Sequence, residues 1–190
     1  MCGRFVFYSD KDDVSLMFNV RKFLSVYKPN YNVSPQHDVP IISRVDDENV
    51  LLAMRWGMQV GKFNMINIRT ETMEKPFFNK MGHCIVLANG FYEWKDKQPR
   101  YITLKDRRLF GLAGIFNDHT FSIITTSPNV FMKSIHDRMP VIIPKGKEED
   151  WILSKSLELL KPSNEEMDAI KVSTLVNSPK NNSSECIKAI

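Results

Sequence analysis

Cysteine is scarce in this sequence, and its few copies show no paired spacing. The 190 residues include three cysteines, Cys2, Cys84 and Cys186, which are odd in number and far apart. No CxxC motif or paired Cys/His spacing of the kind that holds zinc occurs, so we expect no metal and no other cofactor. This cysteine usage fits a reducing compartment.

Long apolar segments are also missing. The apolar runs, such as 84–88 and 141–144, are far too short to cross a bilayer. The first residues carry Arg4, Asp10 and Lys11 in place of the apolar stretch of a signal peptide. We therefore expect a protein with no membrane partner, located in the cytoplasm.

Neither sign of charge dominates, and no basic tail is present. The chain has 26 Lys and Arg against 22 Asp and Glu, a net charge of +4. This charge balance neither excludes nor indicates nucleic-acid binding. If the protein binds DNA, a few individual arginines would have to hold the phosphates. Internal repeats and low-complexity segments are absent as well. We expect one domain over residues 1–190, large enough for a real core, and a monomer.

Short β-rich segments fill most of the chain. We expect strands over 2–8, 39–44, 50–56, 84–94, 101–104, 109–116, 121–126, 138–143 and 170–176. Helices are expected over 10–20, 70–75 and 148–161, with a further helix start at Ser127-Pro128 and an irregular stretch over 57–67. Many strands, few helices and no βαβ rhythm predict an α+β fold with a mostly antiparallel β-sheet, a barrel-like core and peripheral helices.

Position 2 holds the most informative residue. Once Met1 is removed, Cys2 carries an amine and a thiol on adjacent carbons. An α-amine has a pKa of about 7.7–8.0, against about 10.4 for lysine, so far more of it is neutral at pH 7. Such a pair attacks an aldehyde twice: the amine forms an imine, and the sulfur then closes a five-membered ring. Small second residues are also common by chance, so this interpretation depends on the rest of the chain.

Two further residues suit proton transfer. Glu93 follows an apolar strand among aromatic residues, where desolvation would raise its pKa, although a strand-end glutamate in water is equally compatible with the pattern. His136 precedes Asp137 at the start of a strand and is either a proton donor or a structural histidine. The remaining histidines look like surface residues: His37, His83 and His119.

A polar pair and an arginine near the start of the chain are candidates for binding. Asn67 and Arg69 are two residues apart, so an extended segment sends both to one side. An amide can orient an amine and a guanidinium can hold a phosphate, although Arg69 could equally pair with Glu71. Arg4 lies two residues past Cys2 on the same strand face, which would bring a positive charge to the reactive terminus.

Several short motifs occur in a fixed order. They read MCGRF at 1–5, YNVSP at 31–35, RWG at 55–57, NIRTET at 67–72, GFYEWK at 90–95, IITT at 123–126, IHDRMP at 135–140 and VNSPKN at 176–181. This ordered set, with its cysteine at position 2, resembles the SOS response-associated peptidase (SRAP) family, whose members are abasic-site processing proteins. The resemblance covers essentially the whole chain.

The resemblance implies a DNA-damage function. Family members bind single-stranded DNA that contains abasic sites and trap the sugar aldehyde as a thiazolidine DNA–protein crosslink, which shields the lesion. It also implies an enzyme of the peptidase or lyase type that is thought to remove its own Met1. By the same resemblance, we expect association with the nucleoid during DNA damage.

Residue roles follow from the resemblance position by position. Cys2 would be the nucleophile, Asn67 would hold its amine, Glu93 would be the general acid/base and His136 a second proton donor. The implied DNA contacts are phosphates at Arg4 and Arg69, a hydroxyl at Thr125 or Thr126, and base packing at Pro35 and Trp56. The segment 58–64 lacks the tryptophans of many relatives, and Phe63 is expected to take over as the stacking wedge.

Two other functions remain open from the sequence. A cysteine peptidase would use Cys2 as nucleophile and His136 as base, although no helix dipole or oxyanion arrangement is evident at the N-terminus. A non-catalytic reader of single-stranded or modified DNA would bind without any covalent product.

Overall fold

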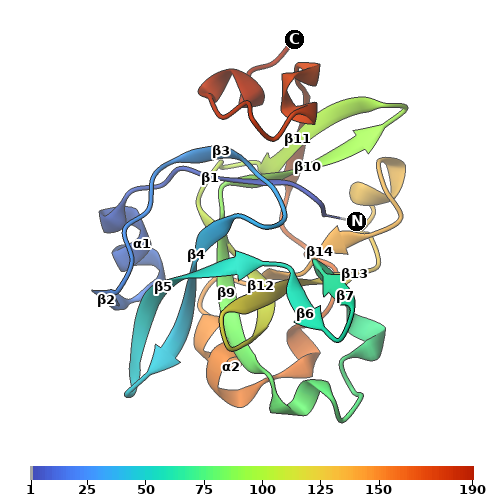
Figure 1. Ribbon diagram of the computed structural model, residues 1–190. Coiled ribbons are helices and arrows are strands. Elements are labelled where there is room, and N and C mark those ends of the chain that lie inside the picture. The colour runs from blue at the N-terminus through green and yellow to red at the C-terminus, as the bar shows by residue number, and fades with distance from the viewer. Residues whose placement is uncertain (1) are drawn as a thin grey trace.

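The computed structural model describes residues 2–190 and has an α+β fold that is mostly antiparallel β-sheet, as predicted (Figure 1). The larger sheet and its satellites contain β2 (Val20–Phe23), β4 (Asp38–Val45), β5 (Glu48–Trp56), β8 (Asn67–Arg69), β9 (Gly82–Ala88), β12 (Phe110–Asn117), β13 (Thr120–Thr126), β14 (Met139–Pro140) and β15 (Ile142–Ile143). The smaller sheet contains β1 (Phe5–Phe7), β3 (Asn30–Val33), β10 (Gly90–Lys95), β11 (Gln98–Leu104) and β16 (Met167–Lys171).

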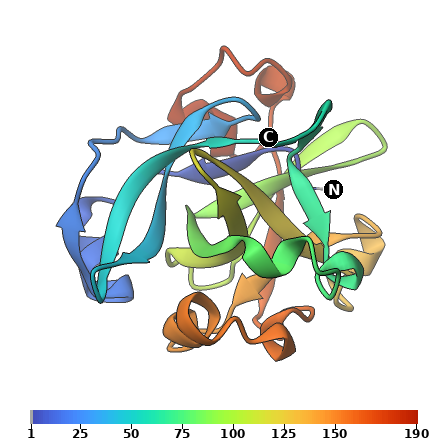
Figure 2. The same ribbon diagram turned by 60° about the horizontal axis from the view of Figure 1, so that its bottom comes forward.

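The larger sheet closes on itself. Its strand order runs β14-β13-β12-β9-β4-β5-β2, and β13 also pairs with β5 through Thr120↔Arg55 and Phe121↔Trp56. This extra pairing joins β4, β5, β13, β12 and β9 into a ring, which is the barrel-like core that the sequence predicts. Figure 2, viewed from another side, shows these strands curving around the centre of the molecule.

A break at Asn89 separates the two sheets. The sequence predicts one strand over 84–94, but Asn89 divides it into β9 and β10. The Asn89 side chain accepts hydrogen bonds from the backbone N–H groups of Tyr8 and Ser9, while its carbonyl accepts the Tyr101 hydroxyl. This polar junction turns the chain from the barrel into the smaller sheet, whose order is β16-β11-β10-β1-β3.

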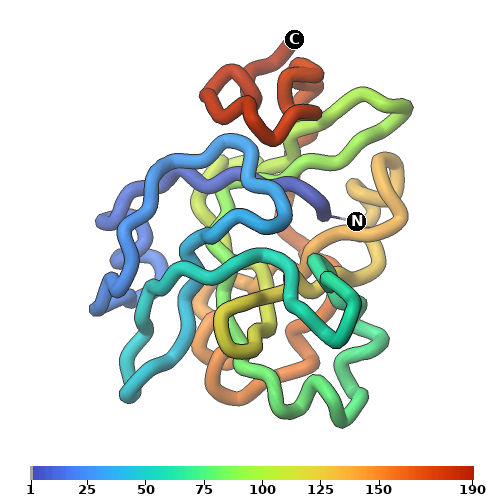
Figure 3. Tube along the Cα trace, viewed as in Figure 1, coloured from blue at the N-terminus to red at the C-terminus, as the bar shows by residue number. Residues whose placement is uncertain are grey.

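The smaller sheet is covered on both faces. One face, with Phe5, Phe91 and Ile102, joins the main core. The other face packs Tyr92 and Tyr101 against Val172 and residues of the last segment of the chain. Figure 3 shows that segment lying over β10 and β11 at the top of the view.

Helices lie at the periphery. α1 (Lys11–Phe18) starts at the predicted cap, since Asp10 accepts a hydrogen bond from the Asp13 N–H, and α2 (Glu148–Ser154) is shorter than the predicted helix. Single 3₁₀ turns are η1 (Thr70–Thr72), η2 (Phe78–Lys80), η3 (Met132–Ser134), η4 (Leu157–Leu159), η5 (Thr174–Asn177) and η6 (Ser184–Ile187).

Several other element predictions were wrong. The helix predicted over 70–75 is only the 3₁₀ turn η1, and the strand predicted over 138–143 is divided into β14 and β15. The stretch 57–67 forms a hairpin of β6 (Met58–Val60) and β7 (Phe63–Met65) where an irregular segment was expected. No helix starts at Ser127-Pro128: the Asn129 side chain accepts a hydrogen bond from the Met132 N–H, and only the 3₁₀ turn η3 follows. The last strand ends at Lys171, short of the predicted 176, because the Ser173 side chain caps η5.

His83 is buried where a surface histidine was expected. It is only 5% exposed, its ring packs against Trp151 at a tilt of 30° with centroids 4.1 Å apart, and its Nδ1 lies 3.1 Å from the Trp151 carbonyl. Burial lowers the pKa of His83 to about 4, so the ring is neutral at pH 7. Its contacts hold α2 against the barrel.

Candidate active site

Cys2 lies just ahead of β1 and is fully buried. Its thiol donates a weak hydrogen bond to the Arg4 carbonyl, with a sulfur–oxygen distance of 3.8 Å. The Asn67 side-chain amide donates to the Cys2 carbonyl at 2.8 Å. Asn67 starts β8, which runs parallel to β13 with Asn67 opposite Ile123, so the barrel fixes this amide beside Cys2.

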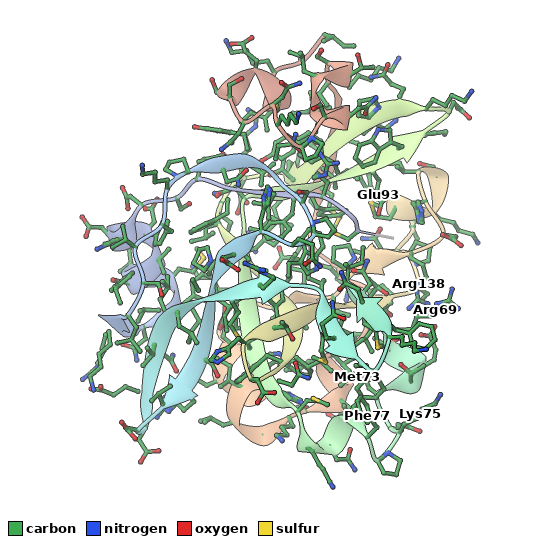
Figure 4. All side chains as sticks on the ribbon, in the orientation of Figure 1. Arg69, Met73, Lys75, Phe77, Glu93 and Arg138 are labelled. Atoms are coloured by element: carbon green, nitrogen blue, oxygen red, sulfur yellow. The ribbon has the colours of Figure 1, made fainter. Side chains whose placement is uncertain are left out.

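Glu93 reaches the same place from β10. Strands β1 and β10 are antiparallel with Phe5 opposite Phe91, and the Tyr92 N–H donates to the Arg4 carbonyl. Continuing this register carries Glu93 past the start of β1, toward Cys2. Figure 4 shows Glu93 near the N-terminal end of the chain.

The two buried acidic groups of the site, Cys2 and Glu93, differ strongly in pKa. Glu93 is 3% exposed, and its burial raises the pKa of the carboxyl to about 7. Burial, and then the nearby charge of Glu93, raise the pKa of the Cys2 thiol far above its usual range. The thiol is therefore protonated at neutral pH and lies beside a carboxyl that titrates in that range.

His136 completes the group from the segment after η3. Its Nε2 lies 3.7 Å from a Glu93 carboxylate oxygen, and burial lowers the pKa of the imidazole. The Arg138 backbone N–H donates to Nδ1 at 3.0 Å. In the neutral tautomer that leaves Nδ1 free to accept this bond, the ring proton is on Nε2, which faces Glu93. Asp137, mostly exposed, lies 2.8 Å from Nδ1 and would accept from the protonated ring.

Arg138 connects the segments that carry His136, Glu71 and Thr125. Its guanidinium bonds to both carboxylate oxygens of Glu71, at 2.5 and 3.0 Å, and donates to the Thr125 carbonyl at 2.5 Å. The Arg138 hydrogen bonds lower the pKa of Glu71 to about 2. The sequence analysis named Arg69 as a possible partner of Glu71 and assigned no role to Arg138. The motif at 135–140, which contains Arg138, was the one feature that could have indicated a role for this arginine.

Three of the expected DNA contacts lie on the surface. Arg69 is exposed at the end of β8, where it is paired in register with Thr125 of β13. Phe63 is 75% exposed in the β6–β7 hairpin, and Pro35 is partly exposed after β3.

The other expected DNA contacts do not fit their positions. Trp56 is fully buried, packs on Phe5 and donates its indole N–H to the Ile66 carbonyl, so it has no face for a base. Thr125 and Thr126 are buried too. Arg4 is half-buried, and one guanidinium nitrogen bonds the Asn32 side chain and the Val176 carbonyl, so it ties β3 to the C-terminal segment.

No group of three or more His, Cys, Asp or Glu side chains suited to a metal ion occurs within residues 2–190. Over the same residues, no helix is long and apolar enough to span a bilayer.

The fold and the site define a class: a β-barrel protein whose second residue is a cysteine, held beside a buried glutamate and a histidine. A family model described as SOS response associated peptidase (SRAP) matches residues 1–179. The chain belongs to this family, as the motif order indicated.

The chain is also similar to named relatives and to a solved structure. The chain is 40% identical over 224 residues to the abasic site processing protein YoqW of Bacillus subtilis (strain 168), with 100% of both chains covered. It is 31% identical to the abasic site processing protein HMCES of Xenopus tropicalis, covering 86% of this chain and 67% of that one. A crystal structure of a Bacteroides thetaiotaomicron protein matches with a TM-score of 0.82 and 26% identity over 100% of both chains.

Proposed function

We propose that this protein processes abasic sites in single-stranded DNA by forming a covalent thiazolidine crosslink through Cys2. The single observation that carries the proposal is the meeting of the Cys2 thiol, the Glu93 carboxyl, the His136 imidazole and the Asn67 amide at the start of β1. The relatives named as abasic site processing proteins support the same substrate.

The chemistry balances without any cofactor. The neutral amine of Cys2, freed by loss of Met1, adds to C1′ of the ring-opened sugar, and loss of one water leaves an imine. The Cys2 sulfur then adds to the imine carbon, and the thiol proton ends on the ring nitrogen. The product retains every other atom of both partners and has no iminium to drive strand cleavage.

Glu93 and His136 are suited to move the protons. A carboxylate whose conjugate acid has a pKa of about 7 accepts a proton from the adding amine and returns it to the departing water at neutral pH. It accepts the thiol proton only as the sulfur bonds to the imine carbon, because the free Cys2 thiol holds its proton too tightly. The neutral His136, with its proton on Nε2, is a donor for the sugar ring oxygen as the ring opens.

Asn67 is suited to aim the amine. Its Nδ2 already bonds the Cys2 carbonyl, and its Oδ1 is buried with no hydrogen-bond partner in the part of the chain that the structure describes. A buried carbonyl oxygen without a donor is unfavourable by about 1–3 kcal/mol. An N–H of the free Cys2 amine is a donor of the right kind for it.

The decisive experiment uses single-stranded DNA with one abasic site. The mature protein should give a heat-stable shifted band in a denaturing gel, and Cys2→Ala should give none. Cys2→Ser separates the two steps, since its amine still forms an imine that only borohydride traps, because a serine hydroxyl closes a far less stable ring. A wild-type protein without the stable band, or a band that persists in Cys2→Ala, would refute the proposal.

A cysteine peptidase acting on other proteins is the weaker alternative. Reactive peptidase cysteines have thiol pKa values well below the usual range, whereas burial raises the pKa of the Cys2 thiol. A non-catalytic DNA reader is the other alternative, and it predicts binding that survives Cys2→Ala with no covalent product.

Removal of Met1 by the protein itself is a further part of the proposal, although Met1 lies outside the described residues. Intact mass should show that wild type lacks Met1, while a retained methionine in Glu93→Gln would assign the removal to this site. Activity of this kind would bring the protein to the nucleoid during DNA damage.

A further inference from the structure

A row of cations crosses the smaller sheet beside Glu93. In the antiparallel pairing of β10, β11 and β16, Glu93 lies opposite Arg100, and Arg100 lies opposite Lys171. Directly opposed residues project from the same face of a sheet. Lys95, two residues after Glu93 on β10, shares this face because side chains alternate along a strand.

The three cations form no ion pair among the residues that the structure describes. Within residues 2–190, no ion pair or side-chain hydrogen bond involves Lys95, Arg100 or Lys171. Arg100 is half-buried, and its Nε is buried with no acceptor. By contrast, Lys105, just beyond the other end of β11, pairs with Glu166 at 2.8 Å. An unsatisfied buried N–H on a charged group is costly, so the row is more stable with an anion bound.

The row also lies where a bound strand would pass. The β10–β11 hairpin projects beyond the N-terminal end of β1, and the segment after β13 lies beside that end (Figure 1). Glu93 belongs both to the candidate active site and to this face. A strand whose sugar reaches Cys2 therefore brings its neighbouring phosphate close to this row.

We propose that Lys95, Arg100 and Lys171 form a phosphate site for the nucleotide next to the abasic sugar. This inference rests on the proposed function and extends the DNA contacts to strands β10, β11 and β16. The planar guanidinium of Arg100 matches two phosphate oxygens, and the two lysines supply point charges on either side.

The test measures the binding of undamaged single-stranded DNA, so that covalent capture plays no part. Fluorescence anisotropy with labelled oligo(dT) over a series of salt concentrations compares wild type with the double variant Arg100→Gln/Lys171→Gln. We expect about tenfold weaker binding at low salt and a salt slope smaller by about 0.7 for each lost phosphate contact.

The matched control removes the same two residue types elsewhere. Arg21 lies on β2 at the opposite side of the molecule and Lys28 follows that strand; both are exposed, and neither has an ion pair in residues 2–190. Arg21→Gln/Lys28→Gln should bind like wild type. Thermal melting of both double variants checks that they are folded.

The outcomes separate the two proposals. Wild-type affinity and salt slope in Arg100→Gln/Lys171→Gln, or an equal loss in the control, would overturn the phosphate site. Weakened binding together with no covalent adduct from wild type would keep the site and reject the crosslinking chemistry. A wild-type protein that binds no single-stranded DNA would reject both.

Discussion

At the scale of single residues, Glu93 is ionisable yet almost completely buried. Its pKa of about 7 lies above its ordinary value of 4.5, so between these pH values the folded state binds more protons than the unfolded state. The free energy of unfolding therefore falls as pH rises through this window, and the loss persists above pH 7. The site that is proposed to act at neutral pH is thus destabilising at neutral pH.

Glu93→Gln separates these two effects. At pH 8 the variant should be more stable than wild type by on the order of 1–3 kcal/mol, and at pH 4 the two should match, as measured by urea unfolding. The rate of crosslinking should fall by about 10²–10⁴. In wild type that rate should rise with pH through about 7, and the variant should lose this dependence. Equal stability of the two proteins at pH 8 would argue against a buried carboxylate.

Residue chemistry was easier to predict than residue exposure. The motifs around Cys2, Asn67, Glu93 and His136 indicated residues that the fold brings together. Trp56 shows the limit: a tryptophan in a DNA-binding motif fits both a base-stacking surface and a core, and only the pairing of β5 with β13 decides that it is buried.

At the scale of elements, the β6–β7 hairpin replaces the predicted irregular segment. Its strands have three residues each, too short for an alternation pattern to be visible in the sequence. The hairpin nonetheless presents Phe63 to solvent, where an aromatic ring is available for a base.

Phe63→Ala should weaken the binding of single-stranded DNA by about 1–3 kcal/mol, because base stacking on an aromatic ring is lost. Its melting temperature should stay close to that of wild type, since the side chain is 75% exposed. Leu16→Ala is the control, because Leu16 is 89% exposed on α1 and has no expected contact with DNA. Anisotropy titrations check the prediction, and an affinity equal to that of wild type would remove Phe63 from the binding surface.

Element boundaries failed where a distant contact decides them. α2 ends at Ser154 because Lys155 adopts a left-handed conformation with φ of 49° and donates its amine to the carbonyls of Asn79 and Met81. Asn89 similarly divides a continuous apolar run through its bonds to Tyr8 and Ser9. These partners are remote in sequence, so the local hydrophobic periodicity cannot predict the boundaries that they set.

At the scale of the whole molecule, the barrel depends on one covering helix. Trp151 of α2 is fully buried, donates its indole N–H to the Cys84 carbonyl and packs against the His83 ring. The chain length indicated a real core, and the succession of short strands without a βαβ rhythm indicated an antiparallel fold. Ring closure through β13 and β5 was less accessible, because it joins segments far apart in the chain.

Trp151→Ala should lower the free energy of unfolding by about 3–5 kcal/mol, since it leaves a large cavity and an unpaired carbonyl. Leu153→Ala, on the same helix but 51% exposed, should cost far less. Below its melting temperature the Trp151 variant should still crosslink DNA, because α2 contributes nothing to the site. A small change in urea unfolding would mean that the barrel closes without this helix.

The position of Cys2 also dictates how the protein is handled. A tag or fusion partner joined ahead of it turns the reactive nitrogen into an amide. The lone pair of an amide nitrogen is delocalised, so this nitrogen does not add to an aldehyde. Since β1 starts only at Phe5, such a fusion should look native by circular dichroism and yet be inert until a protease trims it to the cysteine. Labels belong at Ile190, which is 74% exposed at the other end of the chain.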